Sequence, residues 1–268
     1  MIGLAVLVGE AVAISTVPVN LNTLMGYLTG FFIAGFSMVI NDIMDLKVDE
    51  ANKADRPLVQ GSANLMGAKV LAGIMLTLGL FASAYSGANT FLIAVAFAGI
   101  ASIYNWKLKE RGFSGNLAVA SSMAIPFIYG GVLVGTFVNP LLNMMTLTAF
   151  QAGVGREVVK GIEDKEGDAL RNVRSVARSK GVTFASYLGA TFFLSAVMTS
   201  IIPIILTGTT IAYLLIIGMT DVLFVYLSFF IITKHGREEA HTTKKLALIG
   251  MLMGLIGFII EGVIGGMT

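Results

Sequence analysis

The sequence of 268 residues contains no cysteine, one tryptophan and two histidines, and only 13% of its residues are charged. Without cysteine the chain has no disulfide, no thiolate-held iron–sulfur cluster and no thiol nucleophile. A typical soluble domain has about 25% charged residues. The shortage of charge, together with 56% hydrophobic residues, excludes both a water-soluble globule and a disordered chain.

Long apolar runs take the place of the missing charge. A helix needs about 20 apolar residues to cross a hydrocarbon core of about 30 Å. Nine such runs, bounded by polar, glycine or proline residues, predict nine helices, the first of them short for a span. They cover residues 2–14, 21–49, 65–85, 90–107, 116–137, 140–163, 183–206, 209–233 and 244–265. We therefore expect an all-α, polytopic membrane protein.

The few charges lie on one side of the predicted bundle. All 18 lysines and arginines fall in the connections after the second, fourth, sixth and eighth helices or at adjacent helix ends. The positive-inside rule then places this side, and the N-terminus, in the cytoplasm and the C-terminus outside. The net charge of +2 is a topology signal and does not indicate nucleic-acid binding.

A first acidic block, Asn41-Asp-Ile-Met-Asp45-Leu-Lys-Val-Asp49, ends the second predicted helix. In a continuous helix Asn41, Asp45 and Asp49 share one face, because they are spaced by four residues. Their like charges require a cation between them, and oxygen ligands without histidine or cysteine select Mg²⁺. Pro57 ends any helix there and leaves Arg56 in a loop near this face.

A second acidic block follows the sixth predicted helix, four helices further along the chain. Asp164 and Asp168 have the same spacing of four, and basic residues are interleaved at Arg156 and Lys160. An ordinary helix end with internal lysine–glutamate pairs is the alternative interpretation. The matching positions of the two blocks favour an internal repeat with a site at the repeat interface. We expect a single domain over residues 1–268, with repeats at about 1–110 and 115–235 and a last helix at about 244–265.

Two carboxylate faces that share Mg²⁺ ions, surrounded by arginine and lysine, form a receptor for a diphosphate on the cytoplasmic side. In a bilayer the expected ligand is a polyprenyl diphosphate, whose prenyl group is transferred to a lipophilic acceptor. Aromatic residues of the fourth and fifth predicted helices are candidates for the tail channel, with plain helix packing as the alternative: Phe91, Phe97, Tyr104, Phe127 and Tyr129. The expected partners are therefore these two substrates and membrane lipid, and the oligomeric state is not predicted.

These motifs resemble the UbiA superfamily of intramembrane prenyltransferases. The resemblance rests on Asn41-Asp-x-x-Asp45-x-x-x-Asp49, Asp55-Arg56-Pro57-Leu58 and Asp164-x-x-x-Asp168, and it extends from the second predicted helix onward. It implies Mg²⁺ ligands at Asn41, Asp45, Asp49, Asp164 and Asp168, of which the four aspartates are catalytic. It also implies substrate contacts at Arg56, at Tyr104 and Lys109 in the segment Tyr104-Asn-Trp-Lys-Leu-Lys109, and at Asn116.

The segment from Arg156 to Asp168 most resembles the archaeal digeranylgeranylglyceryl phosphate synthase branch. That likeness implies transfer of a geranylgeranyl group to geranylgeranylglyceryl phosphate in archaeal ether-lipid synthesis. Arg156 and Lys160 would suit the phosphate of this acceptor as substrate contacts, and the alternative is that they balance the neighbouring carboxylates. Prenylation of an aromatic quinone precursor is the alternative with the same chemistry. The chain departs from the superfamily in lacking its opening Arg-Pro-x-Asn motif.

Three acidic residues, Glu10, Asp221 and Glu261, fall inside predicted helices and away from the charged side. Carboxylates at such depth are functional candidates, and they support a hypothesis of a different class, an ion-coupled transporter that uses Asp221 and Glu261. His235 and His241 lack further nearby ligands for zinc, so we expect them in a solvated loop.

Overall fold

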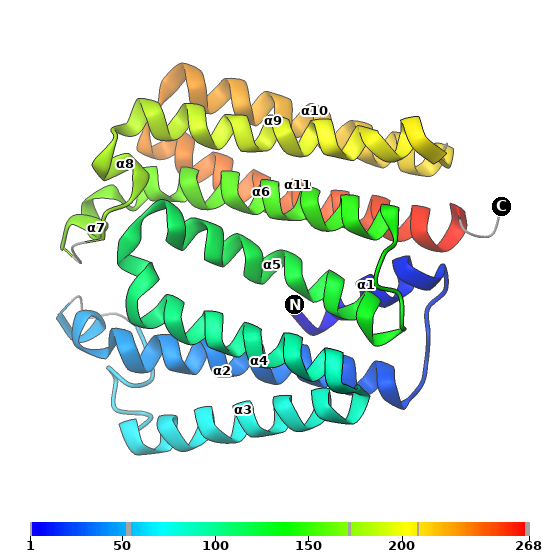
Figure 1. Ribbon diagram of the computed structural model, residues 1–268. Coiled ribbons are helices and arrows are strands. Elements are labelled where there is room, and N and C mark those ends of the chain that lie inside the picture. Colours follow the sequence, from blue (N-terminus) through cyan, green and yellow to red (C-terminus); the bar gives the residue numbers. More distant parts are fainter. Residues whose placement is uncertain (1, 52–54, 171–172, 208, 266–268) are drawn as a thin grey trace.

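The computed structural model describes residues 2–51, 55–170, 173–207 and 209–265. Its long helices run side by side in one bundle, with their connections gathered at the two ends (Figure 1). The described ranges contain nine helices of more than ten residues and no strand. The all-α prediction is confirmed.

Seven helices of the described chain are long and apolar enough to cross a membrane. These seven, with α4 extended through the two turns that follow it, are α2 (Leu21–Ala51), α3 (Leu65–Ser86), α4 (Ala88–Ile103), α5 (Phe113–Leu133), α9 (Val182–Thr207), α10 (Ile211–Lys234) and α11 (Arg237–Ile264). The other two long helices are α1 (Ile2–Ile14), which has only 13 residues, and α6 (Pro140–Glu163), which carries charged residues of the second block. Two short helices, α7 (Lys165–Leu170) and α8 (Val176–Ser179), follow α6.

Several helix starts have the caps that their sequences favour. The Asn64 side chain accepts a hydrogen bond from the Gly67 amide at the start of α3. At the start of α6, Asn139 accepts from the Leu142 amide at 2.9 Å, and Pro140 occupies the first helical position. Such local signals explain why most predicted bounds lie within a few residues of the observed ones.

Three predicted helices differ from the structure at their ends. The last helix begins at Arg237 and not near residue 244, so His241 lies in α11 and not in a loop. The α-helical part of α4 ends at Ile103 and continues as a π turn, Tyr104–Leu108, and a 3₁₀ turn, Lys109–Arg111. The fifth helix covers residues 113–133 in place of 116–137.

The helices pack around several groups of buried side chains. The larger core joins α6, α9 and α10 around Val158, Phe193 and Leu227. A smaller cluster joins α2, α3 and α4 around Ile33 and Phe97. Between these groups, α1 packs against α5 with almost no space between the backbones: a Cβ atom on Gly9 would lie 2.2 Å from the Phe127 carbonyl oxygen.

Three connections of the charged side lie at one end of the bundle, on the left in Figure 1. They are the segment after α2, the two turns after α4, and the segment with α7 and α8. The apolar helices and their common direction make the chain a multi-pass membrane protein.

Candidate active site

The ammonium group of Lys109 bridges two side chains of the first acidic block. Its Nζ donates to Asn41 Oδ1 at 3.1 Å and forms an ion pair with Asp45 Oδ2. The helix α2 continues through this block, so Asn41 and Asp45 do share one face as predicted. The π turn and 3₁₀ turn after α4 change the direction of the chain and bring Lys109 back over α2.

The rest of the first block lies around this bridge. Asp49, one turn beyond Asp45, is buried with 5% of its surface exposed. Arg56 lies beyond the end of α2, and its Nη1 is 3.5 Å from Asp42 Oδ1. Asp42 was not predicted as a site residue, because its place on the cavity side of α2 depends on how α2 packs against α4.

A cavity of about 520 Å³ opens at this end of the bundle between α2, α4 and α5. The cavity is polar at its mouth and apolar in its deeper part, because the lining side chains change from polar to apolar along each helix. The polar lining consists of Asn41, Asp42, Arg56, Tyr104 and Asn105, with Ser37 and Ser122 deeper. The apolar lining includes Ala34, Met38, Phe97, Ile100 and Val119.

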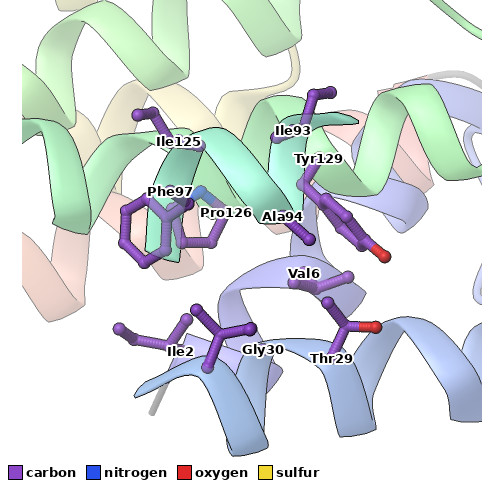
Figure 2. Close-up of a pocket in the computed structure, with 11 residues that line it drawn as sticks. Ile2, Val6, Thr29, Gly30, Ile93, Ala94, Phe97, Ile125, Pro126 and Tyr129 are labelled. Carbon is purple, nitrogen blue, oxygen red and sulfur yellow. The ribbon is translucent and has the colours of Figure 1, made fainter. Parts of the chain in front are cut away.

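The candidate tail-channel aromatics have different positions in the structure. Phe97 and Tyr104 line the cavity, and Tyr129 lines a smaller apolar pocket at greater depth (Figure 2). Phe127 packs instead with Val12 and Phe258 in a core cluster away from both spaces. Phe91 lines neither of them.

The second acidic block lies where α6 ends, at the predicted bound, and the chain continues into the short helix α7. Asp164 is the C-terminal cap of α6, and Asp168 belongs to α7, with its amide donating to the Asp164 carbonyl oxygen at 2.8 Å. The Arg178 guanidinium donates to the Asp168 carbonyl oxygen at 2.8 Å and so holds α7 against α8. Burial raises the pKa of the Asp168 carboxyl, and the negative charge of Asp164 adds to this shift.

Arg156 and Lys160, the predicted substrate contacts of the second block, both pair with Glu157. The Arg156 guanidinium lies 2.5 Å from Glu157 Oε1, and Lys160 Nζ lies 3.5 Å from Glu157 Oε2. The Glu157 carboxylate is buried, with 8% of its surface exposed, which is tolerable only because it is paired. Spacing alone gave no reason to single out Glu157.

Backbone contacts hold the two blocks together. The Arg174 amide donates to the Glu110 carbonyl oxygen at 3.1 Å, so the turn after α4 touches the segment after α7. At Gly112 the backbone has a φ of +59°, and a Cβ atom there would lie 2.1 Å from the Arg174 carbonyl oxygen. Charged groups of both blocks lie within electrostatic range of the Tyr104 phenol: Asp45, Glu157 and Asp168.

The donor groups fit a hard cation. Over the described ranges, no three acidic or histidine side chains are gathered tightly enough to hold a metal ion by themselves. The oxygens of Asn41 and Asp45 nevertheless already share one positive group, the Lys109 ammonium. The Asn105 Oδ1 atom, in the same cavity, is buried without a hydrogen-bond partner. Oxygen donors of this kind suit Mg²⁺.

Asn116 was predicted as a substrate contact. It lies in the first turn of α5, and the side chains that line the cavity do not include it.

Both acids of the transporter hypothesis, Asp221 and Glu261, have hydrogen-bond partners on neighbouring segments. Asp221 accepts from the Ser200 hydroxyl at 2.9 Å, which links α10 to α9. Glu261 accepts from the amide and hydroxyl of Thr210 at 2.9 and 2.8 Å, so it caps the start of α10.

His241 pairs with an acidic side chain at the end of α6. His241 Nδ1 lies 2.9 Å from Glu163 Oε1, and Lys244 Nζ lies 2.6 Å from Glu163 Oε2. These contacts join the charged end of α11 to the end of α6, next to Asp164. Because these contacts stabilise the first turns of α11, the helix begins before its apolar segment.

Comparisons with known proteins agree with this geometry. The model of the UbiA prenyltransferase family matches residues 2–255. A digeranylgeranylglyceryl phosphate synthase of Archaeoglobus fulgidus is 36% identical over 239 residues, which are 88% of this chain and 82% of that protein. A solved structure reported for digeranylgeranylglyceryl phosphate synthase superimposes with a TM-score of 0.85 at 29% identity, covering 98% of this chain and 93% of that one.

A more distant solved structure shows the same fold with ligands. It is a UbiA homologue from Archaeoglobus fulgidus bound to GPP and Mg²⁺, with a TM-score of 0.67, 16% identity, and coverage of 96% of this chain and 95% of that one. The match of the family model over nearly the whole length agrees with the two acidic blocks at one end of a helical bundle. The chain belongs to the UbiA prenyltransferase family.

Proposed function

We propose that this prenyltransferase moves a geranylgeranyl group from its diphosphate to geranylgeranylglyceryl phosphate, in a Mg²⁺-dependent reaction. The observation that carries the proposal is the Lys109 bridge to Asn41 and Asp45 at the polar mouth of a cavity of about 520 Å³ with an apolar depth. A diphosphate at the mouth would leave its tail in the apolar part. The names of the archaeal relatives support this donor and acceptor.

The metal ligands in this proposal are the side chains of the two acidic blocks, Asn41, Asp45 and Asp49 on α2 and Asp164 and Asp168 at α6 and α7. When bound, Mg²⁺ supplies positive charge that neutralises the leaving diphosphate. The Mg²⁺ found with GPP in a homologue of the same fold supports this cofactor.

The side chains at the cavity mouth hold the donor. Arg56 and Lys109 bind the diphosphate oxygens, and Tyr104 lies beside them at the cavity wall. The bond between C1 and the diphosphate oxygen breaks, and its electron pair leaves with the diphosphate. The hydroxyl oxygen of the acceptor forms the new bond to C1 and gives up its proton to the released diphosphate or to a carboxylate of the acidic blocks. The apolar lining around Phe97 and Ile100 excludes water from the allylic cation.

Arg156 and Lys160 belong to the acceptor side of the proposal. Both are cations at the second block, and a phosphate on the acceptor would compete with Glu157 for them. Asn116 lies outside the cavity lining. Its amide donates to the Gly112 carbonyl oxygen, in the turn that follows Lys109, and in the proposal it contacts the substrate from this turn.

The arrangement in the membrane completes the proposal. The charged end of the bundle faces the cytoplasm, which places the N-terminus inside and the C-terminus outside. We propose one domain over residues 1–268, in which α2 and α6 are equivalent helices of two repeats, because each ends in an acidic block at this same end.

The test uses purified protein in lipid nanodiscs with geranylgeranyl diphosphate and, separately, geranylgeranylglyceryl phosphate or an aromatic quinone precursor as acceptor. We expect an ether product, identified by its mass, only with the glyceryl phosphate. Asp45→Asn, Asp164→Asn and excess EDTA should each reduce turnover by about a hundredfold or more. Glu50→Gln, at an exposed position next to Asp49, is the matched control and should keep full activity.

Two results would contradict the proposal in different ways. Transfer to the aromatic acid alone would replace the acceptor but keep the chemistry. Undiminished turnover in both aspartate variants, or in EDTA, would remove the metal-assisted mechanism itself.

A further inference from the structure

The Lys109 ammonium group lies at the point where two of the proposed metal ligands meet. Its Nζ is 3.1 Å from Asn41 Oδ1 and also contacts Asp45 Oδ2, so both oxygens are directed at one atom. Asn41 and Asp45 are one turn apart on α2, and the helix holds their side chains on the same face. A position for one cation is therefore already formed, and a side chain of the protein itself occupies it.

Lys109 and Mg²⁺ cannot share this position. An ammonium group lies about 2.8 Å from a carboxylate oxygen that it contacts, and Mg²⁺ lies about 2.1 Å from its ligands. Two cations on the same two oxygens would be in direct contact, and their repulsion is strong in a partly buried site. Asn41 and Asp45 can therefore bind the metal only after the Lys109 side chain has left them.

The surroundings favour the lysine in the free protein. The Lys109 side chain is 24% exposed and the Asp45 side chain 17%, so water and salt screen their attraction only in part. The turns after α4 also direct the chain back over α2 at this point. The apparent affinity for Mg²⁺ alone is then reduced by the fraction of molecules in which Lys109 has left the position.

A displaced Lys109 has a new partner at the mouth of the cavity. Its ammonium group is carried on a flexible stem of four carbons and has three protons to donate. Arg56 lines the same mouth, with its Nη1 3.5 Å from Asp42 Oδ1. A diphosphate held there by Arg56 would also accept from Lys109 once Lys109 is free of Asp45. The diphosphate thus stabilises the same arrangement that binds the metal.

We infer that Lys109 couples metal binding to donor binding. In the free protein it occupies the metal position, and after the metal has displaced it, it binds the diphosphate. Such coupling is reciprocal, so the diphosphate strengthens Mg²⁺ binding by the same factor by which Mg²⁺ strengthens diphosphate binding. The inference rests on the proposed Mg²⁺ ligands and diphosphate donor, but not on the identity of the acceptor.

Selective acetylation measures the state of Lys109 in the wild-type protein. N-hydroxysuccinimidyl acetate modifies amines that are accessible and unpaired, and mass spectrometry gives the rate at each lysine. We expect saturating Mg²⁺ alone to raise the rate at Lys109 by about fivefold or more, and Mg²⁺ with inorganic diphosphate to lower it again. Diphosphate in EDTA should leave the rate unchanged. The exposed Lys107 is the internal control, and its rate should stay within about twofold throughout.

Calorimetric titration with Mg²⁺ alone, without any prenyl substrate, gives a second measurement. Lys109→Gln should bind Mg²⁺ about tenfold or more tightly than wild type, because no ammonium group competes for the position. Lys107→Gln is the matched control, since it removes the same charge from a side chain that lies over the Trp106 ring, and its affinity should stay within about twofold of wild type. Inorganic diphosphate should tighten Mg²⁺ binding by a larger factor in wild type than in Lys109→Gln.

The outcomes separate this inference from the proposed function. Equal Mg²⁺ affinities of wild type and Lys109→Gln would overturn the inference, as would an acetylation rate at Lys109 that saturating Mg²⁺ leaves unchanged. The acetylation experiment needs no variant, so it remains decisive if Lys109→Gln does not fold. Absence of Mg²⁺ binding in wild type and both variants, with and without diphosphate, would instead overturn the proposed metal ligands and with them the proposed function.

Discussion

Lys109 is the residue with the most direct role in the geometry of the site. It comes from the turn after α4 but contacts two residues of α2, and its side chain is only about a quarter exposed, at 24%. A lysine so placed neutralises the acidic face of α2 before any substrate arrives. It is also in position to meet the diphosphate.

Replacement of Lys109 by glutamine should therefore reduce activity strongly. We expect kcat/KM to fall by about a hundredfold, because one positive group at the developing charge is lost. Lys107→Gln is the control, because this neighbour lies over the exposed Trp106 ring, 5.6 Å from its centre. Equal activities of the two variants in a steady-state prenyl-transfer assay would exclude the role given to Lys109.

Individual residues also show how far the sequence could predict the site. The spacing of Asn41 and Asp45 was sufficient to predict a shared face, because a continuous helix determines it. The sequence did not indicate, in contrast, that Glu157 would pair with both Arg156 and Lys160. Adjacent turns of one helix allow several different charge pairings, and burial by neighbouring helices decides among them.

At the level of elements, the lengths of the apolar runs predicted the helix bounds well wherever a helix ends at the polar residues that flank its run. It failed at the start of α11, because Arg237, Glu238 and Glu239 are helical without being apolar. They extend the helix beyond the apolar span, where His241 and Lys244 reach Glu163 on α6. The π turn after α4 was also missed, since its sequence continues the helical pattern of α4.

The turn at Gly112 provides a prediction at this scale. Gly112→Ala introduces a Cβ atom 2.1 Å from the Arg174 carbonyl oxygen, so the contact between the two blocks must move. We expect the free energy of unfolding to fall by about 1–3 kcal/mol from overpacking. We also expect kcat/KM to fall by about tenfold, because the turn that carries Lys109 shifts relative to the second acidic block, which holds the acceptor.

Gly61→Ala is the matched control for this change. Gly61 also has a positive φ, of +73°, but a Cβ atom there would meet nothing within 4 Å. It should carry only the backbone cost, about 1 kcal/mol, with unchanged kcat/KM. Thermal unfolding in detergent and steady-state assays measure both quantities. A parallel loss of activity in the two variants would show that the contact with Arg174 is unimportant.

For the whole molecule, the separation of charged and uncharged connections is the main organising feature. It was predictable from the sequence, because lysine and arginine positions are read directly. The cavity was not, since its shape depends on how α2, α4 and α5 pack.

The orientation can be measured with single cysteines, because the chain has none of its own. Ser62 is exposed at the charged end, and Val138, at the opposite end, is 78% exposed. In intact cells a membrane-impermeant maleimide should label Val138→Cys directly and Ser62→Cys only after permeabilisation. The cysteine-free chain is the background control, and the reverse pattern would invert the proposed topology.

The π turn after α4 has a practical consequence for studies in solution. It contains Trp106, the single tryptophan of the chain, whose side chain is 71% exposed. Intrinsic indole fluorescence therefore originates from one place, between the wall residue Tyr104 and Lys109. A change in emission on addition of substrate would report a change at this turn, so the kinetics of donor loading can be followed by stopped flow without attaching a dye.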